Sequence, residues 1–138
     1  MNLKLFKRNR RGAALVEFAL IAPVLILLLF ALMEYGWMFF RVSQVNGAAR
    51  HGVRVAVRPD ATSTDVNNAV GLIMNQAGFA SSAYTVDIGT LNAAIGGNVS
   101  VTVTLPYSKV ALTHFPLLPT PTQIRGWAVM AKEGPTGK

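Results

Sequence analysis

One long apolar stretch dominates the hydropathy pattern of the chain. Residues 13–40 contain two charged side chains, Glu17 and Glu34, and residues 18–33 contain none. At about 1.5 Å per residue, these 28 helical residues reach roughly 42 Å, more than the ~30 Å hydrocarbon core of a bilayer. The rest of the chain is too small to wrap a helix that is apolar all round. The pattern therefore predicts a transmembrane helix rather than a buried core helix.

A second pattern carries this helix beyond the apolar stretch. Apolar or small residues recur at three- and four-residue intervals, at Val42, Val45, Ala49, Gly52, Val53 and Ala56. Arg50, Arg54 and Arg58 are spaced by four and fall on roughly the opposite side. Pro59 ends the pattern, because the residue before a proline disfavours helical angles. We expect one helix over about residues 13–57, whose small residues let it pack on the domain that follows.

The remaining residues predict short helical and extended elements. Thr62, Ser63 or Thr64 can cap a second helix that runs to about Ala77 and stops at Gly78. Strands are expected over residues 84–88, 98–105 and 123–132, since the second of these alternates cleanly between Val or Leu and Ser or Thr. The segment Pro106–Pro121 holds four prolines and cannot be regular for long. We expect an exposed partner site there.

These patterns predict an α+β fold built on one long helix. The expected segments are a basic cytoplasmic leader (1–12), a transmembrane helix (13–40), its periplasmic continuation (41–58) and a small periplasmic head (59–138). The head is expected to hold the second helix and a two- to three-stranded antiparallel sheet packed on the outer half of the long helix.

The net charge of +7 supports this topology and argues against nucleic-acid binding. Five basic residues precede the apolar stretch with no acid among them, which favours a cytoplasmic N-terminus. From Pro59 onward four basic residues balance four acidic ones, so the head is neutral.

Catalytic chemistry is not expected. The chain has no cysteine, and its two histidines, His51 and His114, stand in no zinc-type or catalytic-triad spacing. The sequence predicts no metal, no cofactor and no enzyme activity.

A set of motifs lies along the long helix. They are the basic run ending in Gly12, then Glu17, Pro23, the triplet Glu34-Tyr35-Gly36 and the run AARHGVR at residues 48–54. Together they resemble the TadE-like proteins, minor pseudopilins of the tight-adherence pilus machinery, which is related to type IV pili and type II secretion. Trp37, His51 and Val53 depart from the family pattern and leave the role of the arginine-rich run open.

The resemblance implies that a prepilin peptidase cuts after Gly12 and makes Ala13 the new N-terminus. Glu17 would then be the fifth residue of the mature chain, the position pilins use to pair with a neighbour's terminal amine. An ammonium group nearby would offset the desolvation of the carboxylate. The alternative is that Glu17 only marks the inner edge of the membrane span.

Glu34 and the arginine stripe each allow more than one interpretation. Glu34 can form hydrogen bonds within a helix bundle or lie among lipid headgroups. Arg50, Arg54 and Arg58 can bind anionic membrane lipid or the acidic surface of a partner, or form an ordinary solvated helix face.

The expected function is that of a minor pilin-like subunit which joins others through its N-terminal helix and primes or caps a filament. Its expected partners are other pilin or pseudopilin subunits, an inner-membrane platform protein and the prepilin peptidase. The alternative is an uncleaved, membrane-anchored periplasmic scaffold or binding protein that never enters a filament.

Overall fold

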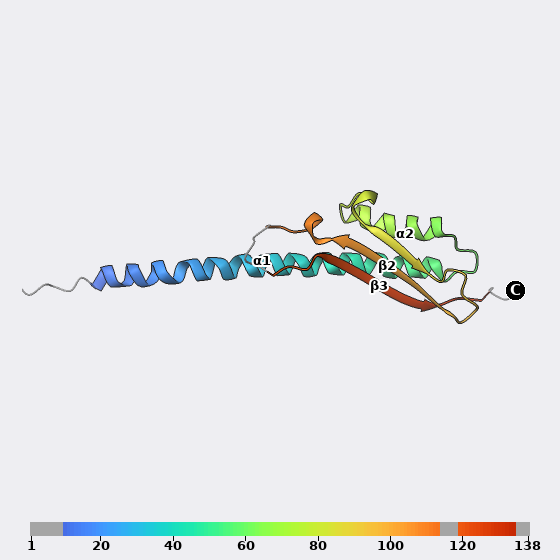
Figure 1. Ribbon diagram of the computed structural model, residues 1–138, viewed down its shortest axis with the longest axis horizontal. Helices are drawn as coiled ribbons and strands as arrows, with labels where there is room; N and C mark the ends of the chain where they lie inside the picture. The colour runs from blue at the N-terminus through green and yellow to red at the C-terminus, as the bar shows by residue number, and fades with distance from the viewer. Residues whose placement is uncertain (1–9, 114–118, 135–138) are drawn as a thin grey trace, which may run out of the picture.

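The computed structural model describes residues 10–113 and 119–134 and shows a small head built on the distal half of one long helix (Figure 1). The elements are α1 (Arg10–Ala56), α2 (Ser63–Gln76), the 3₁₀ helix η1 (Ser81–Ala83), β1 (Thr85–Gly89), β2 (Asn98–Pro106), the 3₁₀ helix η2 (Tyr107–Lys109) and β3 (Gln123–Ala131). The strands form one antiparallel sheet in the order β1-β2-β3. The predicted α+β fold is confirmed.

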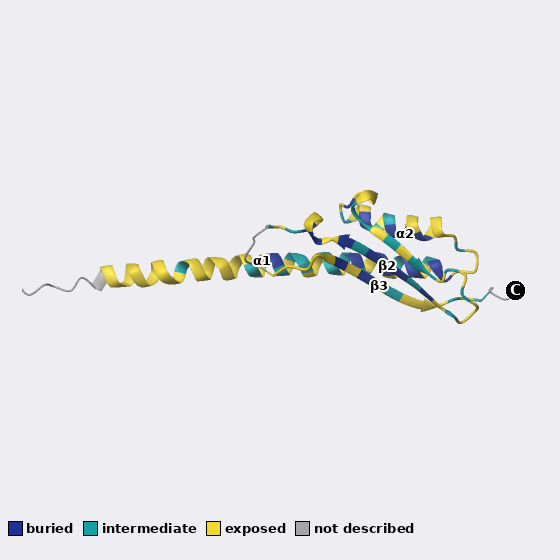
Figure 2. Cartoon of the chain, viewed as in Figure 1, coloured by how far each residue is buried: buried dark blue, intermediate teal, exposed yellow. Residues whose placement is uncertain are grey.

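The first half of α1 projects away from the head (Figure 2). From Gly12 to Met33 its side chains are exposed, apart from the half-buried Ala22 and Ala31. At about 1.5 Å per residue this stretch is roughly 33 Å long, enough for the ~30 Å core of a bilayer. Among the described residues, α1 is the one helix long and apolar enough to cross a membrane. This long apolar helix indicates a membrane anchor.

The second half of α1 is the spine of the head. Its small face is buried as predicted, with Val45, Ala49 and Ala56 fully inaccessible. Gly52 lets the sheet and α2 approach closely, since a Cβ there would lie 2.6 Å from Cγ2 of Val70 and 3.2 Å from Cγ1 of Val101. The expected role of this face in packing within the chain is confirmed.

The inward face of β2 supplies the other half of the core. Val99, Val101, Val103 and Leu105 are completely buried, while the serine and threonines between them are half-buried on the opposite face. Burying an aliphatic side chain of this size contributes roughly 1.5–3 kcal/mol. The alternation in the sequence therefore predicted both the strand and its buried face.

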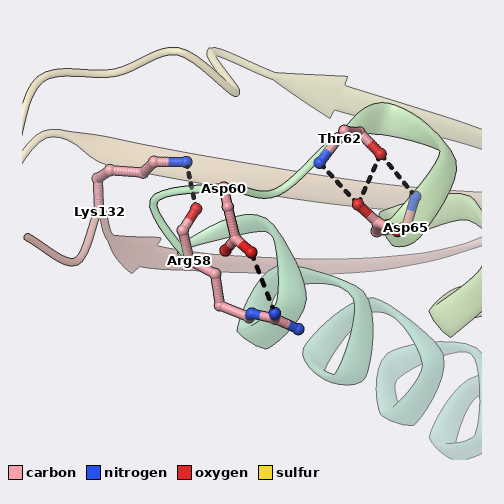
Figure 3. A network of polar contacts seen from close by, with 5 residues as sticks. All are labelled: Arg58, Asp60, Thr62, Asp65 and Lys132. Carbon is pink, nitrogen blue, oxygen red and sulfur yellow. Dashed lines mark hydrogen bonds and ion pairs between the residues drawn. The ribbon is translucent and has the colours of Figure 1, made fainter. Parts of the chain in front are cut away.

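The end of α1 is held by the residue that follows β3 and leads into the capped start of α2 (Figure 3). Lys132, just after β3, donates from Nζ to the carbonyl oxygens of Ala56 at 3.0 Å and Arg58 at 2.8 Å. A cation at this position satisfies terminal carbonyls and opposes the negative end of the helix dipole. Thr62 and Asp65 then form a capping box that starts α2, in agreement with the predicted cap.

Candidate functional site

The residues predicted to serve processing and assembly all lie on the projecting part of α1. Gly12, Ala13 and Glu17 are exposed, and apart from the adjoining helix backbone no atom of the described residues lies within 4 Å of where a Cβ on Gly12 would stand. Glu17 makes no hydrogen bond or ion pair with any other described residue. The helix begins at Arg10, three residues before the expected start. Residues 1–9 lie outside the described residues, so the leader stays a prediction.

Glu34 lies where the head first meets α1, and the residue as a whole is only 1% exposed. Its Oε1 accepts a hydrogen bond from the Tyr107 hydroxyl at 2.5 Å and another from the Leu112 backbone N–H at 3.3 Å. Its Oε2 accepts two from Thr113, one from the backbone N–H and one from the hydroxyl, both at 2.8 Å. Four donors from one short segment therefore surround a single carboxylate.

These donors explain how a carboxylate can be buried here. Leaving an ionised group unpaired in the interior costs several kcal/mol, and hydrogen bonds to a charged group recover about 1.5–3 kcal/mol each. Burial and the hydrogen bond to Glu34 in turn raise the pKa of Tyr107. The Tyr107 hydroxyl consequently keeps its proton and remains a donor across the physiological pH range.

Two aromatic residues beside Glu34 complete the helix–head junction, defined here as Glu34, Tyr35, Trp37, Tyr107 and Thr113. The Tyr35 hydroxyl donates to the carbonyl oxygen of Pro119 at 3.0 Å, and the Trp37 indole N–H donates to that of Val110 at 2.7 Å. The structure places them against the head, in contact with the segment that follows β2.

The junction differs from what the sequence led us to expect. Glu34 was assigned either to a helix bundle or to lipid headgroups, and neither interpretation included a partner within the chain. The segment Pro106–Pro121 was expected to be an exposed partner site; in its described part Pro106, Ser108 and Lys109 are exposed, whereas Tyr107 and Val110 are buried against α1. No periodic pattern links this proline-rich segment to the helix, so sequence reasoning missed the contact.

The arginine stripe lies on the exposed side of α1. Arg50 and Arg54 are exposed, and neither forms an ion pair with any other described residue. Arg58 forms an ion pair with Asp60 at 3.4 Å, but both side chains are more than half exposed, and such surface pairs contribute little to stability. The stripe has the geometry of a solvated face. His51 is half-buried beside it, and His114 lies outside the described residues.

Arg41 is a cation that sequence reasoning did not single out. Its guanidinium carbon lies 4.4 Å from the Trp37 ring centroid and 4.8 Å from that of Phe79. Its Nη1 donates to the carbonyl oxygen of Ala77 and to Oε1 of Gln44, both at 2.9 Å. The guanidinium is therefore held between α1 and the end of α2 by aromatic faces and neutral acceptors.

No group of three or more His, Asp or Glu side chains that could hold a metal ion occurs in the part of the chain that the structure describes.

The comparisons with known proteins agree with the resemblance inferred from the motifs. The family model described as TadE-like protein matches residues 12–54. This range covers the projecting half of α1, the junction residues on α1 and most of its packed half. The match is consistent with a TadE-like protein of the tight-adherence pilus and confirms the predicted family resemblance. No curated protein and no solved structure gives a significant match.

Proposed function

We propose that the chain is a minor pilin-like subunit of a tight-adherence pilus apparatus, joined to other subunits by the projecting half of α1. The observation that carries the proposal is the coincidence of the family match with α1. The matched residues 12–54 are almost the whole helix, whereas the head lies outside the match. The family's common element is thus the helix that would meet neighbouring subunits and the membrane.

Glu17 supports an assembly role for this helix. It is the one charged residue between Gly12 and Met33, and the head contributes no partner to it in the described structure. A carboxylate at the centre of a bilayer costs about 2.5–3.5 kcal/mol on insertion scales and less near an edge. A terminal amine on Ala13 of a neighbouring subunit would supply the missing counter-charge once the leader is removed.

The partners follow from this arrangement. A prepilin peptidase would cut between Gly12 and Ala13, an inner-membrane platform protein would hold the helix during assembly, and other pilins or pseudopilins would pack along it. In this proposal the head stays in the periplasm and the subunit primes or caps a filament. It acts as a structural component and has no catalytic role.

The mature N-terminus tests the processing step. Mass spectrometry of the full protein, purified from cells with an active prepilin peptidase, should give a chain that begins at Ala13. A bulky residue in place of Gly12 should block the cut and leave membrane insertion intact. A chain that still begins at Met1 in such cells would instead support the alternative, an uncleaved membrane-anchored scaffold.

Replacement of Glu17 tests assembly separately from processing. We expect Glu17→Ala to be inserted and cut normally but to lose co-purification with pilus subunits. Glu133→Ala removes an exposed carboxylate from the head and serves as the charge-matched control. Normal assembly of the Glu17 variant would show that this carboxylate only marks the edge of the span.

A further inference from the structure

An apolar groove lies on α1 at the border between its projecting half and the head. It is lined by Leu32, Met33, Gly36, Trp37, Phe40 and Leu112, and has a volume of about 480 Å³. Gly36 has open space beside it, because no atom of the other described residues, apart from the adjoining helix backbone, lies within 4 Å of where a Cβ would stand. Leu32, Met33 and Phe40 are all more than half exposed. The groove is continuous with the apolar stretch that indicates the membrane anchor.

Arg41 lies next to this groove, and two aromatic residues that it contacts also line the groove. Its guanidinium is 4.4 Å from the Trp37 ring centroid and 5.9 Å from that of Phe40, and both rings line the groove. At about 1.5 Å per residue, Arg41 is roughly 12 Å along the helix axis from Met33. When the 20 residues 18–37 fill the ~30 Å hydrocarbon core, Arg41 is roughly 6 Å beyond its outer edge and stands in the headgroup region.

Arg41 has no counter-charge within the described residues. No carboxylate among the described residues forms an ion pair with it, and Glu34, two turns away, is enclosed by its own donors. Within the same residues, Nη1 donates to both acceptors, the side chain of Gln44 and the carbonyl oxygen of Ala77. Nε is buried and has no hydrogen-bond acceptor, whereas Nη2 has no acceptor but is not buried. The guanidinium is thus held rigid by Trp37 and Phe79, and its Nη2 amino group is left to donate to an outside anion.

We propose that this groove and Arg41 together form a binding site for one anionic phospholipid. An acyl chain would lie over Gly36 between Leu32 and Phe40, and the phosphate would accept a hydrogen bond from Nη2 of Arg41. The charge fits the cation, and the apolar groove fits the chain. Because the guanidinium is already oriented, little side-chain entropy is lost on binding. This inference rests on the membrane anchor and not on the proposed pilus function.

The test uses fluorescence of the full chain in lipid nanodiscs. The chain has two tryptophans, so a Trp127→Phe background leaves Trp37 as the reporter inside the groove. Lipids with brominated acyl chains quench a tryptophan they touch. Brominated phosphatidylglycerol and brominated phosphatidylethanolamine are titrated separately into unbrominated phosphatidylethanolamine. The anionic lipid should reach half-maximal quenching at about one fifth of the mole fraction, the effect of roughly one basic side chain near the surface.

Two variants test the cation and the apolar groove of the site separately. Arg41→Gln should remove the preference for phosphatidylglycerol while brominated chains still quench Trp37. Gly36→Leu should fill the groove and reduce quenching by both lipids; Gly47→Leu, on another open position of α1, is its matched control. Circular dichroism establishes that each variant is folded. If Arg41→Gln fails to fold, the Gly36→Leu and Gly47→Leu pair still decides the outcome.

Four results would overturn the proposal. Equal quenching by the two lipids would remove the charge preference, and an unchanged preference in Arg41→Gln would assign it elsewhere. Quenching that falls as the protein-to-lipid ratio rises would show that a helix of another subunit occupies the groove. Soluble glycerol phosphate carries the same phosphate without the chains, so it should leave the quenching unchanged; competition by it would indicate a phosphate site alone.

Discussion

The Tyr107 hydroxyl donates a 2.5 Å hydrogen bond to Oε1 of Glu34, which lies 73 residues earlier in the chain. One partner belongs to the helix that indicates the membrane anchor and the other to the segment that leaves the central strand of the head. Because Thr113 and Leu112 donate to the same carboxylate, this segment is fixed to α1 at one height and in one orientation. The junction thereby couples the pose of the head to that of the helix.

Loss of the Tyr107 hydroxyl should weaken the junction measurably. We expect Tyr107→Phe to lower the free energy of unfolding of the head by about 1.5–3 kcal/mol, because the hydrogen bond reaches a charged and buried acceptor. Denaturant unfolding of the full chain in detergent, followed by circular dichroism, measures this loss. Tyr84→Phe is the matched control, since the Tyr84 hydroxyl has no hydrogen-bond partner among the described residues. Equal stability of the two variants would contradict the prediction.

The contact between α1 and β3 depends on a glycine. A Cβ at Gly126 would lie 2.5 Å from the carbonyl oxygen of Val45, which is backbone and cannot turn aside. Gly126→Ala should therefore separate β3 from α1 and cost about 1–3 kcal/mol of unfolding free energy. Gly47→Ala, at an open helical position, should instead stabilise the chain by about 0.5–1 kcal/mol. The two thermal unfolding curves should shift in opposite directions.

Regular elements of this fold could be predicted because their residues repeat with a period. Alternation from Val99 to Leu105 set the buried face of β2, and the spacing of Val45, Ala49 and Val53 set the packed face of α1. The capping residues at 62–64 predicted where α2 starts, and the structure places the cap at Thr62; Gly78 follows the end of the helix with a φ of +85°. These signals are local, so each one can be found without knowledge of the rest of the chain.

The contacts at the junction and beside it could not be predicted in this way. Glu34 carries a signal of its own, a charge inside an apolar stretch, but its donors come from a proline-rich segment without periodicity. Arg41 looked like an ordinary flanking charge, since Phe79 and the Ala77 carbonyl reach it only after α2 has packed on α1. The charge of Glu34 within an apolar stretch marked the position as unusual. Its hydrogen-bond donors could not be foreseen, because they depend on how the chain after β2 returns to α1.

The cap at the end of α1 should contribute to the stability of the head. Lys132→Met keeps most of the aliphatic stem but removes the donors to the carbonyl oxygens of Ala56 and Arg58. We expect a loss of about 1 kcal/mol, together with faster amide hydrogen exchange in the last turn of α1. Lys109→Met, an exposed lysine in η2, is the control. Unchanged exchange in the last turn of α1 would show that the lysine contributes no cap.

Acid should weaken the start of α2 through Asp65. Hydrogen bonds from the Thr62 hydroxyl at 2.6 Å and the Thr62 backbone N–H at 3.0 Å hold the pKa of Asp65 below its ordinary value near 3.8. A carboxyl whose pKa is lower in the folded than in the unfolded state stabilises the fold above its unfolded pKa. This contribution is lost as the pH falls through the folded pKa. Unfolding free energy measured between pH 6 and about pH 2 should therefore fall less steeply in Asp65→Asn than in the unsubstituted chain.

Asp87→Asn removes an exposed carboxylate from β1 that has no hydrogen bond to other described residues, so it should keep the original slope. If Asp65→Asn also keeps that slope, the capping box does not contribute to the acid sensitivity of the head.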